Sequence, residues 1–181
     1  MERVVRNKKR LIALFTAVCM LIACTFIQTD AVNAASQVSY SWPTKCHRIC
    51  GKWGLESGHT QPYHYGIDIA AARGAKVKAA EKGKVINAGK YGGYGYCVII
   101  KHSNGQCTLY GHMQRNLKVK KGKTIKKGTL LGYVGGTGRG GVECYDPHLH
   151  FGIYKSKSAI SKENSGVKAK KITLNPKKLL P

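Results

Sequence analysis

The stretch from Gly74 to Val134 constrains the fold most, because it alternates short apolar runs with glycine-containing turns and shows no long helical period. Short runs bounded by such turns are typical of strands in sheets, sandwiches and barrels. The strands expected here are Val77–Ala80, Gly83–Ala88, Cys97–Ile100, Cys107–His112 and Leu130–Val134. We therefore predict an all-β domain built mainly from antiparallel strands.

The dipeptide Asn104-Gly105 predicts a hairpin between two of these runs, because it favours a loop of two residues. In that register Ser103 pairs with Gln106, and Cys97 lies opposite His112. The hairpin thus fixes which side chains share a face of the sheet.

Five cysteines follow residue 35, namely Cys46, Cys50, Cys97, Cys107 and Cys144. In the predicted register Cys97 and Cys107 are too far apart along the ladder for a disulfide. A Cys97–Cys144 bond and a local Cys46–Cys50 bridge stay open, and the odd count leaves at least one thiol without a partner in its own chain.

Two histidines alternate with apolar residues in the stretch Asp146–Tyr154, which reads Asp-Pro-His-Leu-His-Phe-Gly-Ile-Tyr. This period of two predicts a strand with both imidazoles on one face. The stretch His64–Ile69 alternates in the same way, so His64, Gly66 and Asp68 should share a face of one strand. The glycine between the histidine and the carboxylate leaves room for an ion or a substrate.

These side chains, together with His112 at the end of another expected strand, suggest a catalytic metal site. Catalytic zinc takes three protein ligands, often two histidines and a carboxylate, and keeps one position open for water. His64, Asp68 and one histidine of the His148/His150 pair would supply that set. The other two histidines would orient or deprotonate the water and then protonate the leaving amine.

The first 35 residues predict export to the cell envelope or beyond it. Five basic residues precede an apolar run from Leu11 to Ile27, and small residues at an A-x-A-like spacing follow before Ser36. A cleaved secretory signal is the leading interpretation. Two alternatives stay open: Cys24 as the lipidated first residue of a lipoprotein, or an uncleaved anchor. Any membrane contact would then run through this N-terminal segment alone.

The chain carries a formal charge of +23, and 26 basic against 6 acidic residues follow residue 35. Such a charge favours an acidic partner such as nucleic acid, anionic lipid or an anionic wall polymer. The export signal and the lack of an aromatic-basic RNA motif argue against nucleic acid. We expect the lysines of Lys118–Lys127 to line a solvated sheet edge, and Lys155–Lys171 to form an exposed loop.

Three motifs in order resemble the lysostaphin-like zinc metallopeptidases, which cut peptide bonds in bacterial peptidoglycan. They are His64-x-x-x-Asp68, Leu109-Tyr110-Gly111-His112 and His148-Leu149-His150-Phe151. The resemblance spans roughly Trp42 to Pro176. It implies a mostly antiparallel fold with an active-site groove, and one Zn2+ per chain bound by His64, Asp68 and His150. It also implies that His112 and His148 form the catalytic pair, which activates water and stabilises the tetrahedral intermediate.

The predicted organisation is a signal or membrane-targeting segment at 1–35, a loop-rich segment at 36–60 and a zinc metallopeptidase domain at 61–181. The predicted function is hydrolysis of stem-peptide or cross-bridge bonds in peptidoglycan by metal-activated water. The alternative is a non-catalytic wall-binding or regulatory module of the same fold. Two features depart from the family pattern: Gly152 stands where glutamate is common, and the loop Arg139–Asp146 is longer. That loop should border the groove and influence which substrate is cut.

Overall fold

The computed structural model describes residues 38–55, 63–141, 144–165 and 167–181, and the part from Val38 to Pro181 forms one compact unit. The predicted export segment, residues 1–35, lies outside the described residues. Within the described ranges, no helix is both long enough and apolar enough to cross a membrane.

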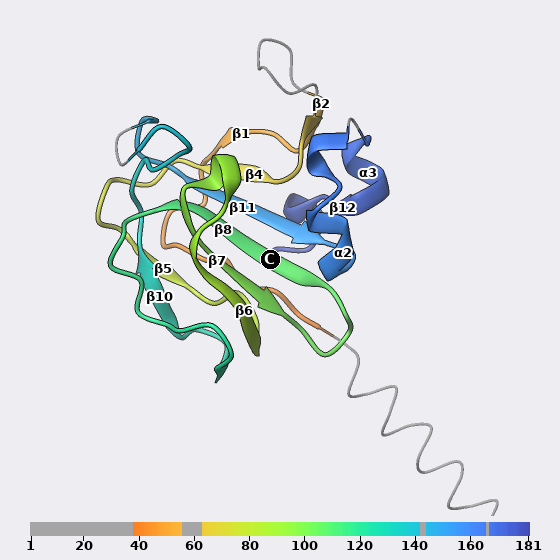
Figure 1. The fold of residues 1–181 in the computed structure, drawn as a ribbon, viewed down its shortest axis with the longest axis horizontal. Coiled ribbons are helices and arrows are strands. Elements are labelled where there is room, and N and C mark those ends of the chain that lie inside the picture. Colours follow the sequence, from red (N-terminus) through yellow and green to blue (C-terminus); the bar gives the residue numbers. More distant parts are fainter. Residues whose placement is uncertain (1–37, 56–62, 142–143, 166) are drawn as a thin grey trace, which may run out of the picture. The chain divides into compact units, whose positions relative to one another are not determined.

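The centre of the unit is an antiparallel sheet of eight strands (Figure 1). In spatial order the strands are β1 (Ile49–Gly51), β4 (Ile67–Ile69), β11 (Leu149–Tyr154), β8 (Cys107–Met113), β7 (Tyr96–Lys101), β6 (Gly83–Lys90) and β9 (Thr124–Ile125), while β12 (Thr173–Leu174) also pairs with β11. The predicted all-β, mainly antiparallel fold is confirmed. The segment 36–60 contributes β1 to one edge of this sheet, and the lysine-rich stretch contributes β9 to the other.

Two short strand pairs accompany the sheet. They are β5 (Lys76–Lys78) with β10 (Leu130–Tyr133), and β2 (Gly54–Leu55) with β3 (Tyr63–His64). Val77 and Leu131 from the first pair share a buried cluster with Val98, Ile100 and Phe151 of the main sheet. This pair therefore covers one face of the main sheet and completes the larger core.

The other face is covered by the C-terminal elements α2 (Lys157–Ile160), η2 (Glu163–Ser165) and α3 (Ala169–Ile172), which end near η3 (Pro176–Lys178) (Figure 1). Cys97 and Ile99 of β7 pack here with Ala159 and Ile172. Successive residues of a strand point to opposite faces, so β7 serves both clusters in alternation.

The prediction that Lys155–Lys171 is an exposed loop is wrong. This segment forms α2, η2 and the start of α3, and it buries Ala159, Ile160, Glu163 and Ala169. The side chain of Ser156 caps α2 by accepting a hydrogen bond from the backbone N–H of Ala159. The few apolar residues lie among lysines and serines at no regular spacing, so the sequence shows no periodic stripe that would indicate burial.

The Asn104-Gly105 hairpin has a three-residue loop rather than the predicted two-residue loop. The backbone N–H of His102 donates to the carbonyl of Gln106, and Gly105 adopts a φ of 81°. The side chain of Asn104 accepts from the N–H of Gln106, which stabilises the wider turn. The register therefore shifts by one residue, and a bulge between Tyr96 and Val98 absorbs the shift farther along the ladder.

All five cysteines after residue 35 have free thiols in the structure, so neither the Cys97–Cys144 nor the Cys46–Cys50 bridge is formed. Cys97 points into the cluster beneath the C-terminal helices, whereas Cys144 packs against Gly138 and Gly140. Cys107 pairs with Lys101 at the hairpin end of β7, far along the ladder from Cys97.

Candidate functional site

Three short strands bring the predicted metal ligands together. His150 of β11 lies directly opposite Asp68 of β4 on one side and Gly111 of β8 on the other. The predicted single strand His64–Ile69 is wrong, because the chain leaves β3 after His64 and enters β4 at Ile67. His64 instead pairs with Gly54 of β2. The break at Tyr65-Gly66 still allows the side chain of His64 to reach Asp68.

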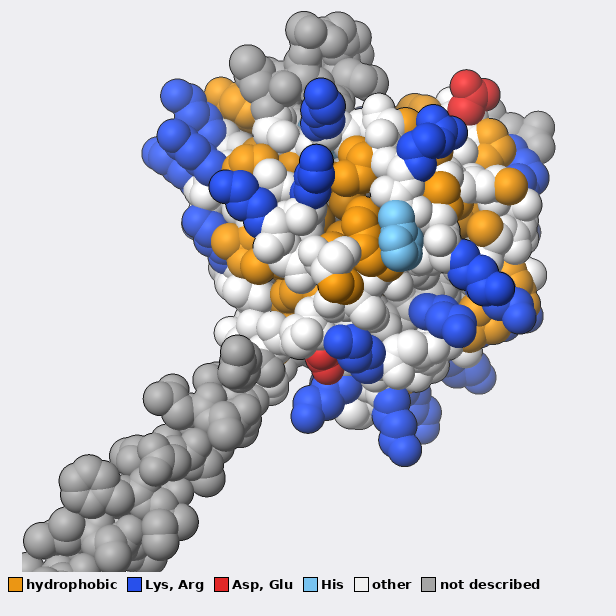
Figure 2. All heavy atoms as spheres, turned by 180° about the vertical axis from the view of Figure 1, so that it is seen from behind, with side chains coloured by type: hydrophobic (Ala, Val, Ile, Leu, Met, Phe, Trp, Pro, Cys, Tyr) orange, Lys and Arg blue, Asp and Glu red, His pale blue; other side chains and the backbone are white. Residues whose placement is uncertain are grey.

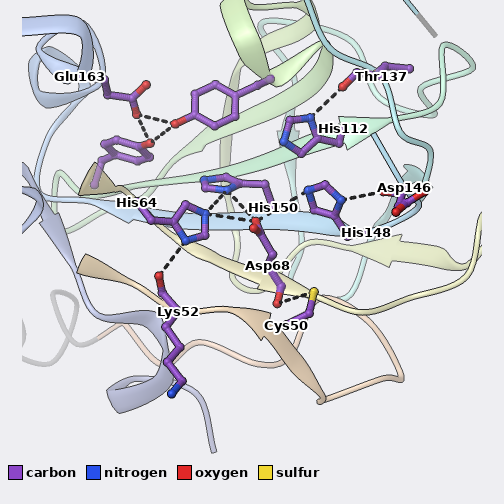
Figure 3. Close-up of polar contacts among 12 residues, drawn as sticks. Cys50, Lys52, His64, Asp68, His112, Thr137, Asp146, His148, His150 and Glu163 are labelled. Atoms are coloured by element: carbon purple, nitrogen blue, oxygen red, sulfur yellow. Dashed lines mark hydrogen bonds and ion pairs between the residues drawn. The ribbon is translucent and has the colours of Figure 1, made fainter. Parts of the chain in front are cut away.

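The ligand atoms of these residues form a nearly equilateral triangle (Figure 3). Nε2 of His64 lies 3.2 Å from Oδ1 of Asp68 and 3.0 Å from Nδ1 of His150. Nδ1 of His150 lies 3.0 Å from Oδ1 of Asp68. Four ligands at zinc–nitrogen distances of about 2.0 Å would be about 3.3 Å apart in a tetrahedron. The triangle therefore has nearly the dimensions of one face of such a coordination shell.

The hydrogen bonds around the triangle favour a cation at its centre. Nδ1 of His64 lies 2.8 Å from the carbonyl of Lys52, which can only accept, so Nδ1 carries the proton and Nε2 carries a lone pair. This lone pair faces the carboxylate of Asp68. Burial alone would raise the pKa of Asp68, but the adjacent imidazoles of His150 and His64 outweigh burial and hold that pKa well below its usual range. A divalent metal ion fits this set of donors.

Glycines make room for the triangle at two close approaches. A β-carbon on Gly66 would lie 2.7 Å from Nε2 of His150, and one on Gly51 would lie 2.3 Å from Oδ2 of Asp68. From the sequence, Gly66 was expected to leave space for an ion or a substrate. In the structure the ring of His150 occupies that space, so Gly66 serves the ligand itself.

His112 and His148 lie beside the triangle, with ring centroids 4.7 Å apart. Nδ1 of His112 donates to the carbonyl of Thr137 at 2.7 Å, and Nδ1 of His148 donates to the carbonyl of Asp146 at 2.7 Å. Both Nε2 atoms are therefore acceptors, and that of His148 lies 3.9 Å from Oδ1 of Asp68. All five predicted site residues thus meet in one place (Figure 3).

Burial lowers the pKa of His112 to about 3, with a further contribution from the neighbouring His150. Its imidazole is consequently neutral near pH 7 and can accept a proton at Nε2. His112 also has a φ of 58°, the one positive φ at a non-glycine residue among the residues described. The carbonyl of Thr137 is the anchor that the sequence analysis missed. A backbone acceptor leaves no mark in the sequence.

Two aromatic groups at the site were also missed by the sequence analysis. Tyr145 is 46% exposed, and its ring lies edge-on to His112 with centroids 4.7 Å apart. Tyr94 lies at the other side, 4.8 Å from the ring of His150. Tyr145 belongs to the long loop that was expected to border the site. Tyr94 lies in the short 3-10 helix η1 (Gly92–Tyr94), between β6 and β7.

Comparison with known proteins is consistent with this geometry. The model of the family described as Peptidase family M23 matches residues 62–162. DD-carboxypeptidase/endopeptidase Mpg of Neisseria meningitidis serogroup B is 40% identical over 93 residues, which are 51% of this chain and 20% of that protein. Outer membrane antigenic lipoprotein B of Haemophilus influenzae is 36% identical over 126 residues, which are 68% of this chain and 28% of that protein.

Two solved structures share the fold. A zinc containing peptidase from Vibrio cholerae has a TM-score of 0.57 at 29% identity, covering 65% of this chain and 37% of that chain. The antimicrobial peptidase lysostaphin from Staphylococcus simulans has a TM-score of 0.60 at 26% identity, covering 78% of this chain and 52% of that chain. The chain spans less than two thirds of each of these four proteins. The fold is thus of the lysostaphin type, and the chain belongs to peptidase family M23.

Proposed function

We propose that this chain is a zinc-dependent endopeptidase that hydrolyses peptide bonds in bacterial peptidoglycan. The observation that carries the proposal is the convergence of His64, Asp68 and His150 at 3.0–3.2 Å, beside the acceptor nitrogens of His112 and His148. The names of Mpg and of the zinc containing peptidase support the reaction and the metal.

His64, Asp68 and His150 would hold one Zn2+ through Nε2, Oδ1 and Nδ1. When bound, zinc acts as a Lewis acid that polarises a carbonyl and lowers the pKa of water. The single carboxylate of Asp68 offsets only part of a divalent charge, so the site stays electrophilic. The carbonyl of Lys52 keeps the correct tautomer of His64 in place.

The two remaining histidines would handle protons at Nε2. His112 is neutral and is anchored through Nδ1, so its Nε2 would accept a proton from the attacking water. His148 is anchored in the same way by Asp146, so its Nε2 would accept a hydrogen bond from the attacking water and help to orient it. The proton would then pass to the leaving amine, which completes hydrolysis.

Substrate choice would depend on the loop that carries Tyr145. The backbone N–H groups of Cys144 and Tyr145 both donate to the carbonyl of Gly136, which holds these two residues in place. The half-exposed ring of Tyr145 beside His112 would then contact the residue next to the scissile bond. This contact would favour a flat or extended peptide over a bulky one.

A basic surface would hold the enzyme near anionic wall polymers. Lys and Arg side chains spread over the face shown in Figure 2, with few acidic groups between them. Lys82, Lys84, Lys101 and Lys126 line one concavity at the β6–β9 edge. Lys84 and Lys101 lie directly opposite each other, an arrangement of like charges that costs stability unless an anion is near.

Salt-dependent retention on phosphocellulose would test this surface. Lys84→Gln with Lys101→Gln should elute at lower salt than Lys177→Gln with Lys178→Gln, a control of equal charge change at an exposed site near the C-terminus. Equal elution of the two double variants would show that net charge, and not this concavity, sets the retention.

Wall digestion tests the proposed reaction. Purified protein should retain about one zinc per chain, release new amino termini from isolated peptidoglycan, and lose that release in His148→Ala. Zinc-loaded protein that sediments with walls and leaves them uncut would contradict the endopeptidase and favour a binding module. Mass spectrometry of fragments from defined peptidoglycans would then identify the bond.

Export to the envelope is part of the same proposal, and the lipoprotein name of the Haemophilus influenzae relative supports it. Intact mass of the mature protein distinguishes the routes. A start near Ser36 indicates a cleaved signal, whereas a start at Cys24 with added lipid mass indicates a lipoprotein. A full-length cytoplasmic product would contradict export.

A further inference from the structure

His150 differs from the other histidines of the site in how its ring is held. His64, His112 and His148 each donate one ring N–H to a backbone carbonyl, which fixes ring orientation and tautomer. The ring nitrogen of His150 that points away from the triangle, Nε2, is buried and has no hydrogen-bond partner among the described residues. Outside the triangle itself, packing contacts must therefore hold the ring of this proposed ligand.

The ring of Tyr94 provides the packing surface. Its centroid lies 4.8 Å from that of His150, and a β-carbon on Gly111 would lie 3.0 Å from the Tyr94 ring and 3.3 Å from Cβ of His150. Gly111 is the residue directly opposite His150 in the sheet. The missing side chain at Gly111 thus lets the ring of Tyr94 approach that of His150, with an angle of 42° between the ring planes, while Gly66 closes the other side.

The hydroxyl of Tyr94 is fixed in turn by Glu163. Oε1 of Glu163 accepts hydrogen bonds from Tyr94 at 3.0 Å and from Tyr154, and the Glu163 residue is only 8% exposed. No Lys or Arg of the described residues forms an ion pair with this carboxylate. Tyr65, which follows the ligand His64, donates to the backbone carbonyl of Glu163 at 2.7 Å.

The position of Glu163 is costly unless it has a role. A carboxyl group buried without a cation loses its hydration, and an apolar side chain would fill the same space without that loss. The carboxylate offers what an apolar residue lacks, namely one acceptor that fixes two tyrosine hydroxyls at a defined point. One of these tyrosines is the residue that packs on His150.

We propose that Glu163 is a positioning residue, which holds the Tyr94 ring against His150 and thereby sets the orientation of His150 for metal binding. The inference rests on the proposed function only in that His64, Asp68 and His150 bind zinc. Glu163 does not touch substrate or metal; it acts through Tyr94. The C-terminal segment, which carries none of the site motifs, would thus determine part of the zinc affinity.

The test is the zinc dissociation constant, measured by competition with a chromogenic chelator on purified full-length protein. Glu163→Ala and Tyr94→Leu should each weaken zinc binding by about tenfold or more, the usual cost of losing a group that orients a ligand. Glu163→Gln should retain most of the affinity, because its amide oxygen can still accept both hydroxyls. Tyr94→Phe keeps the ring but loses the hydroxyl, so its zinc affinity should lie between those of Glu163→Gln and Tyr94→Leu.

Tyr40→Phe is the matched control, since it also removes one tyrosine hydroxyl bonded to a side-chain oxygen, that of Gln106, outside the site. Its zinc affinity should equal that of the wild type. The d–d absorption of the cobalt(II)-loaded proteins gives a second readout. It should change in Glu163→Ala and Tyr94→Phe and stay unchanged in Tyr40→Phe.

The possible outcomes distinguish a positioning role of Glu163 from a purely structural one. Glu163→Ala that is less stable yet binds zinc as tightly as the wild type would overturn the positioning role and leave a structural one. If Glu163→Ala does not fold, unchanged zinc affinity and cobalt spectrum in Tyr94→Phe would overturn it equally. A wild-type protein that binds no zinc overturns the proposed function and this inference together, whereas zinc binding with no effect of either variant overturns only the inference.

Discussion

The two sides of His150 differ in how they are built. On one side Asp68 and His64 reach it through polar contacts of 3.0 Å, from strands whose residues form recognisable motifs. On the other side Tyr94 reaches it through ring packing, supported by Glu163 from a 3-10 turn after the last long strand. The first side would select the proposed zinc ion by its donor atoms. The second side contributes shape, and it comes from residues without a motif.

The donor atoms and the packing contacts therefore constrain the sequence to different degrees. Donor atoms must be of particular types, so they constrain the sequence at fixed positions. Packing contacts and supporting hydrogen bonds can come from any segment that reaches the site, so they leave only a weak pattern in the sequence. Variants of residues on each side of His150 separate these two contributions.

Asp68→Ala removes a ligand from the polar side and should abolish zinc retention and turnover. The remaining two histidines cannot complete a catalytic zinc site with three protein ligands. Metal content after dialysis, measured by plasma mass spectrometry, checks this. His47→Ala, an exposed histidine stacked on Trp42, is the control and should retain zinc. Full zinc content in Asp68→Ala would place the metal elsewhere.

His148→Ala should keep zinc but lower kcat by about 10²–10⁴, the usual contribution of a positioned acid or base. Its Nε2 lies near Asp68 without being part of the triangle. Metal content and peptide hydrolysis, measured on the same preparation, distinguish loss of zinc from loss of catalysis. Loss of zinc in this variant would mean that His148, too, is a ligand.

Glu163 should make stability depend on pH. Burial raises its pKa from 4.5 to about 7, although hydrogen bonds from Tyr154 and Tyr94 act in the opposite direction. Between these values the folded chain binds the proton and the unfolded chain does not, so stability falls as the pH rises from about 4.5 to 7. The full difference corresponds to about 3 kcal/mol, at about 1.4 kcal/mol for each tenfold change in the protonation equilibrium.

Urea unfolding of the metal-free protein at pH 5 and pH 7.5 measures that difference. Burial lowers the pKa values of His102, His112 and His150, which makes the folded chain more stable as the pH rises, so the comparison with Glu163→Gln isolates the carboxyl group. The wild type should lose more stability than the variant over this interval. If the free energy of unfolding changes equally with pH in the two proteins, Glu163 is not buried as described.

Tyr145→Ala should have the smallest effect, because it removes only an aromatic contact at the border of the site. Such a contact is worth about 0.5–1.5 kcal/mol, so KM should rise about two- to tenfold with kcat nearly unchanged. Zinc affinity should be unaffected. A fall in kcat as large as that in His148→Ala would instead give Tyr145 a part in the chemistry.

The sequence predicted the central strands and all five polar side chains of the site, because period-two alternation and residue type are both local signals. It placed His64 and Asp68 on one face of a single strand. The chain in fact breaks at Tyr65-Gly66, and His64 pairs with β2. The two side chains meet nevertheless, so their proximity was predicted from an incorrect local structure.

The sequence did not reveal the support behind the site. Glu163 lies in a lysine- and serine-rich segment that was expected to be exposed, and its burial depends on Tyr65, Tyr94 and Tyr154 from three separate segments. Likewise, the carbonyls that orient three histidines are backbone groups, which every residue carries. Contacts of this kind are determined by tertiary packing, and a single sequence contains no pattern for them.

The left-handed backbone at His112 affects how that position can be studied. At a φ of 58° asparagine and glycine are tolerated far better than alanine or a β-branched residue. Replacement by alanine therefore changes two things at once, the loss of a proton acceptor and a strained main chain. A mutational library at this position would rank residues partly by conformational preference. His112→Asn is the substitution that reports on the imidazole alone, and directed evolution of this scaffold should treat the position as a constraint on backbone geometry as well as on catalysis.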